Sequence, residues 1–323
     1  MENKLDSYHL PVTGRNILRF AFPTIVMTVF NTFYTMVDGL FVSNLIGTDA
    51  LSAINLTAPA IGLITAVSGM LATGGSAVVM KKMGEGREQE AREDFTLLIL
   101  TNAVVGAVMM VLGYALMDTL LGAMGLSGGV FRYCRTYLSG YLIFTIPVLL
   151  MYNFSLYLIA ADKSKLSLLC TVAGGVTNIV LDVVLVVGLR MGVAGAALAT
   201  ILSQTASAAF VTAILTRTKE MYQVKIAMIR LDGRMLMRII RIGLPAGLQS
   251  VMYSLSNVII QSSVNSLGTD TVAAWAAYGK IDGLFWMTVG AFGISITTFV
   301  GQNYGAREYG RIRRGMKQCL AMA

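Results

Sequence analysis

The stretch NTFYTMVDGLFVSNL, residues 31–45, decides the fold because it places one acid, Asp38, inside a long apolar run that begins near Ile17. A helix rises about 1.5 Å per residue, so roughly 20 residues cross the hydrocarbon core of a bilayer. Asp38 is therefore expected deep within a membrane-spanning helix. A carboxylate at that depth usually faces a cavity or a partner and serves function. The alternative is a buried aspartate that neighbouring groups satisfy for packing alone.

Two further features of this first span suggest ion coupling. Asn31, Thr35 and Asp38 are spaced i, i+4, i+7, so they share one face of the helix. Pro23 lies 15 residues before Asp38 and removes a backbone donor, so it can kink the helix. A bendable helix that carries a titratable acid is a candidate for coupling ion movement to a change of shape.

The composition predicts an all-α polytopic membrane protein. The 323 residues are 55% hydrophobic and 13% charged, with a mean hydropathy of +0.69, which is too apolar for a soluble domain of this size. Three cysteines are scattered without motif spacing, and His9 is the one histidine of the sequence. Disulfide frameworks, histidine metal sites and Ser–His catalysis therefore lack the residues they need, and we expect neither an enzyme nor a cofactor.

Apolar runs predict eight membrane spans. They cover residues 16–45, 52–80, 95–121, 136–160, 166–188, 192–215, 236–266 and 271–302. On this map 21 of the 25 Lys and Arg residues fall on one side and 3 on the other, with Lys280 inside a span. Such an imbalance places the basic side and the N-terminus in the cytoplasm. The net charge of +8 is thus a topology signal and gives no reason to expect a nucleic-acid partner.

An internal repeat divides the map into two units. RFAFP (19–23) aligns with RIGLP (241–245), and GTDALSA (47–53) aligns with GTDTVAA (268–274). Gly62, Gly69 and Gly84 fall opposite Gly283, Gly290 and Gly305, at an offset of 221. The repeat is parallel and six spans long. It predicts a first lobe over residues 1–215, a basic cytoplasmic linker over 216–235 and a partial second lobe over 236–323. That second lobe would hold spans seven and eight and the start of a ninth, which favours a truncated chain over a natural eight-span protein.

A second polar group lies in the fifth span, where Asn178 and Asp182 are four residues apart on one face. Thr200 in the sixth span and Asn153 in the fourth add neutral polar groups. In a dry cavity, desolvation and mutual repulsion raise the pKa of at least one of two carboxylates, so a proton can be held near neutral pH. The same oxygens could ligate Na⁺ instead. Hydrogen bonding between helices is the structural alternative.

A polar stripe follows one face of the seventh span. It consists of Gln249, Tyr253, Asn257 and Gln261, each four residues apart. In the repeat, Tyr253 aligns with Asn31, and Asn257 aligns with Thr35. Two helices that line one central cleft would show this pattern, although a packing stripe would as well. Asp38 aligns with Ile260, which confines the acid to the first unit. Methionines such as Met36 suit an adaptable pocket, or serve as filler in apolar helices.

Two segments resemble the multidrug and toxic compound extrusion (MATE) transporters. They are ILRFAFPTIVMTVFNTFYTMVDGLFVSNLIGTDALSAI (17–54) and WAAYGKIDGLFWMTVGAFGISITTFVGQNYGAREYGR (275–311). The likeness covers essentially the whole chain, and the motif GQNYGA (301–306) is fairly specific. The resemblance implies a two-lobed helical bundle in which six-helix lobes face each other across a central cleft. It also implies export of cationic and amphiphilic compounds against an inward H⁺ or Na⁺ gradient.

The resemblance assigns roles to matching positions. The family's first-helix aspartate matches Asp38, and its fifth-helix Asn-x-x-x-Asp matches Asn178 and Asp182. Its fourth-helix asparagine, sixth-helix threonine and first-helix proline match Asn153, Thr200 and Pro23. Two features depart from the family. One branch has an acid on the seventh helix, whereas residues 235–267 contain none, and the chain stops before helices nine to twelve.

We therefore expect a monomeric secondary antiporter in the inner or plasma membrane, with organic cations as substrates and H⁺ or Na⁺ as coupling ion. A lipid-linked oligosaccharide flippase of the same superfamily is one alternative. Such proteins place basic residues in the cleft, and Lys280 is the one basic residue that lies away from the ends of the predicted spans, which weighs against this alternative. A non-transporting relic with one complete lobe is the other alternative.

Overall fold

The structure is a computed structural model that describes residues 11–45, 48–123, 128–161, 163–217, 232–267 and 269–322. Every regular element in this part of the chain is a helix. The α-helices are α1 (Gly14–Leu45), α2 (Thr48–Gly84), α3 (Glu88–Ala123), α4 (Gly128–Ile143), α5 (Thr145–Ala160), α6 (Ser164–Asp182), α7 (Gly192–Arg217), α8 (Gly233–Asn265), α9 (Thr269–Gly305) and α10 (Tyr309–Met322). A π-helix, η2 (Val183–Gly188), continues α6.

Several helices have the length and apolar composition that a bilayer requires. Within the described residues, five segments qualify, and a bent pair of helices makes a sixth. The five lie in α1, α2, α3, α6 with η2, and α7. Helices α8 and α9, predicted as the seventh and eighth spans, contain 33 and 37 residues, which exceeds the roughly 20 that a bilayer core needs. The prediction of an all-α, multi-span protein is confirmed.

The fourth span differs from its prediction. Instead of one helix over 136–160, helix α4 starts at Gly128 and ends at Ile143, and α5 leaves it at an angle of 58°. The break follows from Pro147 in the first turn of α5, because a proline ring clashes with the carbonyl four residues earlier, here that of Ile143. The chain therefore turns at Phe144 and restarts as a new helix.

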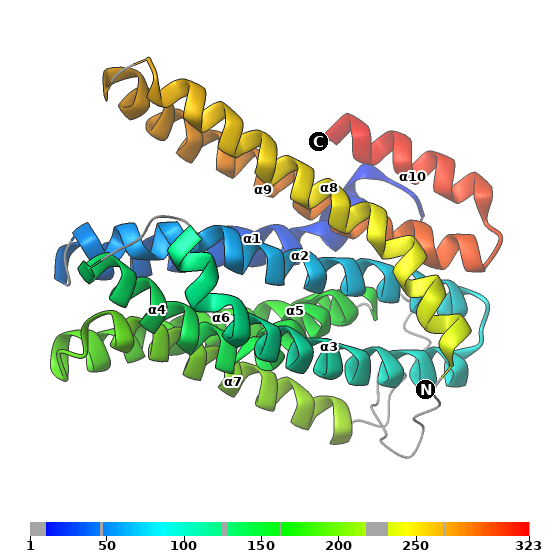
Figure 1. The fold of residues 1–323 in the computed structure, drawn as a ribbon. Coiled ribbons are helices and arrows are strands. Elements are labelled where there is room, and N and C mark those ends of the chain that lie inside the picture. Colours follow the sequence, from blue (N-terminus) through cyan, green and yellow to red (C-terminus); the bar gives the residue numbers. More distant parts are fainter. Residues whose placement is uncertain are drawn as a thin grey trace.

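The helices form two lobes, α1–α7 and α8–α10, that meet near one end of the molecule (Figure 1). Helix α7 continues to Arg217 and α8 begins at Gly233, so each helix extends two or three residues into the predicted linker. Residues 218–231 of that linker lie outside the described part of the chain. Asp232 caps α8, and its carboxylate accepts hydrogen bonds from the backbone N–H groups of Arg234 (2.9 Å) and Met235 (3.3 Å).

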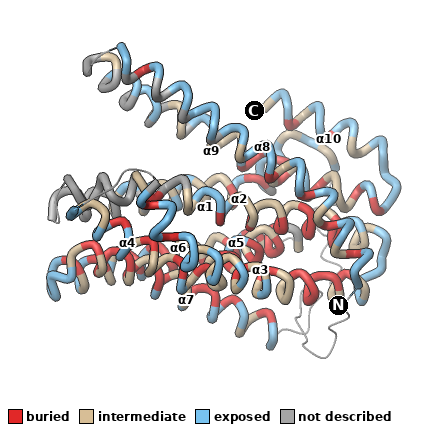
Figure 2. The backbone as a smooth tube through the Cα atoms, viewed as in Figure 1, coloured by how far each residue is buried: buried red, intermediate tan, exposed pale blue. Residues whose placement is uncertain are grey.

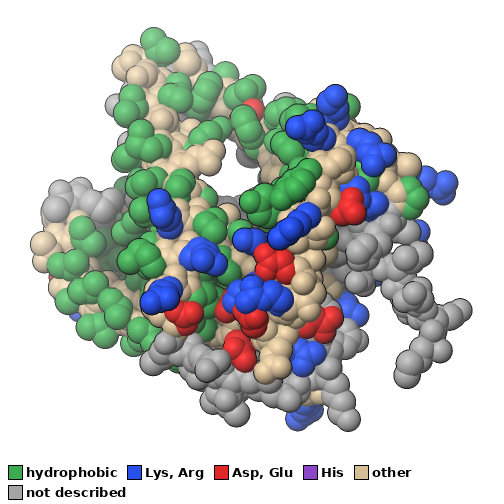
Figure 3. Space-filling model, turned by 90° about the vertical axis from the view of Figure 1, so that its right-hand side faces the viewer, with side chains coloured by type: hydrophobic (Ala, Val, Ile, Leu, Met, Phe, Trp, Pro, Cys, Tyr) green, Lys and Arg blue, Asp and Glu red, His purple; other side chains and the backbone are tan. Residues whose placement is uncertain are grey.

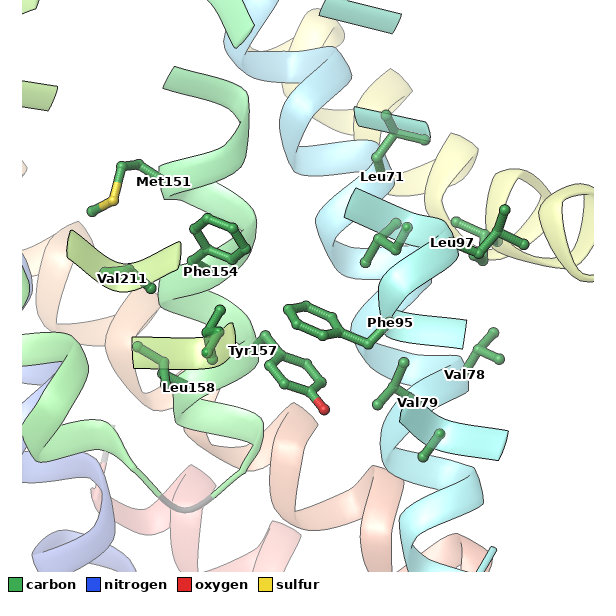
Figure 4. Packing of buried hydrophobic residues seen from close by; sticks show 14 of the residues in the cluster. Leu71, Val78, Val79, Phe95, Leu97, Met151, Phe154, Tyr157, Leu158 and Val211 are labelled. Atoms are coloured by element: carbon green, nitrogen blue, oxygen red, sulfur yellow. The ribbon is translucent and has the colours of Figure 1, made fainter. Parts of the chain in front are cut away.

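The largest hydrophobic core lies in the first lobe and extends into the second. Buried side chains of α2, α3 and α5 interlock there (Figure 4), and the rings of Phe95 and Tyr157 stack at 3.4 Å and 8°. Met235 and Ile239 of α8 belong to the same cluster. The first turns of the second lobe are therefore anchored in the core of the first lobe, which fixes where the lobes join.

Glycines bring the lobes into backbone contact along α2. A Cβ at Gly74 would collide with the carbonyl oxygen of Ile239 in α8, and a Cβ at Gly243 would collide with that of Met70. Close approach of this kind is how small residues join helices in membranes. Helix α2 therefore provides the surface of the first lobe against which α8 of the second lobe packs.

A second glycine contact, between α2 and α9, is self-complementary. A Cβ at Gly84 would collide with the carbonyl oxygen of Gln302, and a Cβ at Gly305 would collide with that of Lys81. The repeat offset of 221 converts one of these contacts into the other. The two units of the repeat are therefore related by an approximate two-fold axis that passes through this crossing.

The lobes converge at one end and diverge at the other. Helices α8 and α9 approach α2 where α2 joins α3 and separate from α1 and α2 towards the opposite end (Figures 1 and 2). The convergent end, where α8 begins and α9 joins α10, is called the basic end below. Figure 3 views it directly and shows Lys and Arg side chains interspersed with acidic ones. Lys82 pairs there with Asp94 (2.5 Å), and Arg87 with Glu85 (3.2 Å).

Candidate functional site

Asn178 of α6 and Thr200 of α7 form a polar pair at the centre of the candidate site. Asn178 and Asp182 lie on one face of α6 and are 1% and 0% exposed. The Asn178 Nδ2 donates a hydrogen bond to Thr200 Oγ1 of α7 at 3.4 Å. Asp182 lies 18 residues beyond the start of α6, roughly 27 Å along the axis from the basic end. The acid is therefore fully buried and lies within the membrane-length segment Ser164–Gly188, nearer to the end opposite the basic end.

Helix α1 packs against this pair. Gln204, one turn beyond Thr200, donates a hydrogen bond to the Tyr34 hydroxyl at 3.5 Å. The absence of a side chain at Gly175 makes room for the rings of Phe30 and Tyr34, because a Cβ there would collide with Phe30. Helices α1, α6 and α7 therefore come together at the level of the polar residues. Sequence reasoning missed Tyr34 and Gln204, although Gln204 is four residues from Thr200 and shares its face.

The π-helix η2 begins immediately after Asp182. The Leu189 backbone N–H donates to the carbonyl oxygen of Val184 at 2.9 Å, which is the i→i+5 pattern of a π-turn. Such insertions are uncommon and often accompany functional sites. The run VVLVVG contains no residue that announces this geometry, so the sequence analysis had no signal from which to predict it.

Asn153 belongs to a second buried polar pair. Its Nδ2 donates to Asn102 Oδ1 of α3 at 2.8 Å, and the two residues are 2% and 0% exposed. Counted along α5 and α6 from their shared connection, Asn153 lies roughly 10 Å closer to the basic end than Asn178. The structure therefore brings Asn178 and Thr200 together and places Asn153 in a separate pair. Asn102, an amide within the predicted third span, was not singled out.

The residues predicted to line a cleft lie on α1 and α8. Asn31 and Met36 are exposed on α1, and Gln249, Tyr253 and Asn257 are exposed on α8. The Tyr253 ring packs edge-on against Trp286 of α9, with centroids 6.1 Å apart. The side chains of Thr35, Asp38 and Gln261 lie outside the described part of the structure. Their backbones belong to α1 and α8, which places Asp38 on the same helix as Tyr34.

Pro23 lies within α1, which continues as a single helix on both sides of it. Farther along, the Thr32 hydroxyl donates a hydrogen bond to the Met287 Sδ of α9. Helix α1 thus contacts the polar pair of its own lobe and also reaches the second lobe. A change in the position of α1 would therefore alter both its contact with α7 and its contact with α9.

The chemistry of the site favours a small cation or a proton. One carboxylate, one amide and one hydroxyl supply hard oxygen ligands, which suit Na⁺ or H⁺ rather than a transition metal. Among the described residues, no three His, Cys, Asp or Glu side chains gather as a metal cluster would require.

Comparison with known protein families identifies the family to which this chain belongs. The MatE family model matches residues 23–184 and 245–323, well over half of the chain. The chain belongs to the MatE family. It is therefore a membrane transport protein of that family rather than an enzyme.

Individual MatE proteins resemble the chain at low identity. The probable multidrug resistance protein YoeA of Bacillus subtilis (strain 168) is 23% identical over 312 residues, which cover 94% of this chain and 67% of YoeA. The multidrug export protein MepA of Staphylococcus haemolyticus (strain JCSC1435) is 22% identical over 259 residues, which cover 80% of this chain and 57% of MepA. The chain thus spans about three-fifths to two-thirds of the length of these relatives.

A solved MatE structure shares the fold. An outward-facing multidrug resistance MATE family transporter of the MOP superfamily superposes with a TM-score of 0.90 at 23% identity, over 96% of this chain and 69% of that one. The all-helical MATE-like fold expected from the sequence is confirmed, and this chain matches 69% of that structure.

Proposed function

We propose that the chain is a secondary antiporter of the inner or plasma membrane that exports cationic or amphiphilic organic compounds in exchange for H⁺ or Na⁺. The observation on which the proposal rests is the buried Asp182, on the same face of α6 as Asn178, which bonds to Thr200. An ionised carboxylate is costly inside a membrane unless a cation or proton accompanies it. Loading and release of that ion therefore change the charge of the site by one unit.

Helix α1 connects the ion site to the substrate path. It contacts α7 through Tyr34 and Gln204, and it contacts α9 through Thr32 and Met287. We assign Asp38, on the same helix, as the second coupling carboxylate and Pro23 as the point at which α1 bends. Ion binding would move α1, and α1 would then alter the surface that holds substrate.

The diverging faces of the lobes suit organic cations. Tyr253 and Trp286 are 52% and 50% exposed, and Met36 is 49% exposed on the opposite lobe. Aromatic faces attract cations through their quadrupoles, and methionine adapts to ligands of varied shape. Together with Gln249 and Asn257, these side chains supply an amphiphilic surface without fixed positive charge. From the positive-inside distribution we infer that the basic end faces the cytoplasm and that this surface opens to the outside.

Efflux of ethidium from energised cells tests the ion site. In the protein expressed from its complete gene, Asp182→Asn should reduce gradient-driven efflux at least tenfold, because the amide cannot take up and release a proton. Asp118→Asn is the matched control, since Asp118 is an exposed acid near the end of α3 that pairs with Arg135 at 2.9 Å. Unchanged efflux in Asp182→Asn, at equal amounts of protein in the membrane, would overturn the proposed role.

A further inference from the structure

A cavity of about 280 Å³ lies between the lobes at the basic end, away from the polar pair of α6 and α7. The first lobe contributes residues from the last two turns of α2 and from the α2–α3 connection. The second lobe contributes Arg238 and Ile242 of α8 and Tyr304 of α9. The cavity adjoins the glycine crossing of α2 and α9, so any molecule within it touches both lobes.

Cations are the largest group of side chains in the lining of this cavity, four of its nine residues. Lys81, Lys82, Arg87 and Arg238 contribute positive charges, and Glu85 contributes the one acid of the lining. Three of the four cations already have acidic partners. Lys81 lies 3.7 Å from Glu85, Lys82 contacts Asp94, and Arg87 is held by Glu90. Hydrogen bonds to Glu90 and then to Glu85 raise the pKa of Arg87. These contacts hold the first-lobe cations in place.

Arg238 differs from the other three cations. Its side chain is exposed, and it forms no ion pair with any residue that the structure describes. A guanidinium presents a planar fork of donors that matches a phosphate. Across the cavity, the Lys81 ammonium lies 5.8 Å above the Tyr304 ring. The same cavity is therefore lined by an anion-binding fork of the second lobe and a positioned ammonium of the first lobe.

The cavity also contains apolar side chains in its lining. Ala77, Val78 and Ile242 line it together with the cations, and Ile242 is 42% exposed. Cationic and apolar surfaces in one cavity suit an amphiphile that carries an anionic head. The position is also appropriate, because Lys81 lies three residues before the end of a membrane-length helix, at the level where lipid headgroups lie.

We propose that this cavity binds the phosphate group of an anionic amphiphile, such as an acidic phospholipid, and thereby ties the two lobes together at the basic end. The phosphate lies between Arg238 and Lys81, and the alkyl part covers Ala77 and Ile242. A ligand that contacts both lobes favours the conformation in which they meet. This inference goes beyond the proposed antiport and does not depend on which ion or substrate is carried.

Native mass spectrometry of the purified full-length protein tests the site. The apparent Kd for phosphatidylglycerol is compared with that for phosphatidylcholine of the same chain length. Binding of phosphatidylglycerol should be at least about tenfold tighter, and Arg238→Gln should weaken it by roughly tenfold. Arg241→Gln is the matched control, because Arg241 is exposed on the same helix but does not line the cavity. Equal losses in the two variants, or equal binding of the two lipids, would refute a specific site.

Two further measurements test whether the phosphate belongs to a lipid and whether both lobes hold it. If inorganic phosphate at millimolar concentration displaces phosphatidylglycerol and binds as tightly, the site takes a free anion and the amphiphile is overturned. Lys81→Gln, in the first lobe, should also weaken lipid binding. The double variant with Arg238→Gln should lose less than the product of the single losses, since both groups hold one phosphate. Strictly multiplicative losses would contradict a bridging site.

Discussion

At the residue scale, the hydrogen bond from Asn178 to Thr200 shows what spacing predicts and what it cannot predict. The four-residue interval correctly placed Asn178 and Asp182 on one face of α6, and both are buried. Asn153 was grouped with them as a further neutral amide of another span and by the family resemblance, whereas Asn153 bonds to Asn102 of α3. Spacing determines a face of one helix, but a partner on another helix depends on packing that no local pattern records.

Thr200→Val tests that hydrogen bond. The substitution keeps the side-chain shape but leaves the Asn178 amide without this acceptor, which in a membrane protein costs about 0.5–2 kcal/mol. We expect a lower unfolding temperature in detergent and a weaker apparent affinity for the coupling ion in efflux assays. Thr177→Val is the matched control, because its hydroxyl bonds within its own helix to the carbonyl oxygen of Ala173. Equal behaviour of the two variants would show that the bond contributes nothing.

At the element scale, apolar run length predicted where helices lie, to within a few residues for most of them. The bend between α4 and α5 was not predicted, even though Pro147 lies within the run. A proline in a membrane helix can be absorbed as a kink when neighbours satisfy the freed carbonyl, or it can end the helix. Which of these happens depends on the surrounding helices. The π-helix after Asp182 was missed for the same reason, since its residues would equally suit an α-helix.

Gly84→Ala tests the crossing of α2 and α9. A methyl group there would collide with the backbone carbonyl oxygen of Gln302, so the helices must separate. We expect a loss of roughly 1–3 kcal/mol in stability, measured as a lower unfolding temperature by tryptophan fluorescence. Gly62→Ala on the same helix has no atom within 4 Å of the new Cβ, so it should be neutral or stabilise by up to about 1 kcal/mol. A stable Gly84→Ala protein would show that the crossing is not tight.

At the scale of the whole molecule, the internal repeat predicted two units but not how they meet. Their join depends on Met235 and Ile239 entering the first-lobe core and on glycines far apart in sequence. Neither feature is visible as a local motif. The side of the membrane that each end faces was predicted from the distribution of charge, which is independent of packing and can be measured directly.

Thiol labelling measures that orientation. Glu88→Cys introduces a thiol at the exposed start of α3 at the basic end, and Arg132→Cys introduces one on α4 at the opposite end. The native cysteines Cys134, Cys170 and Cys319 are buried, so they give little background. In intact cells a membrane-impermeant maleimide should label Arg132→Cys at once and Glu88→Cys only after permeabilisation. The reverse pattern would invert the proposed orientation and the direction of export.

The two glycine contacts on α2 have a mechanical consequence. Gly74 and Gly84 are ten residues apart, so the second lobe is held at two points separated by roughly 15 Å. From Gly74 to the far end of α2 at Thr48 the helix extends for roughly 39 Å more. If α2 tilts about its contact at Gly74, the two parts of the helix act as unequal arms. A displacement of about 1 Å at Gly84 then becomes about 2.6 Å at the far end. Small displacements at the basic end would therefore become larger displacements at the diverging end.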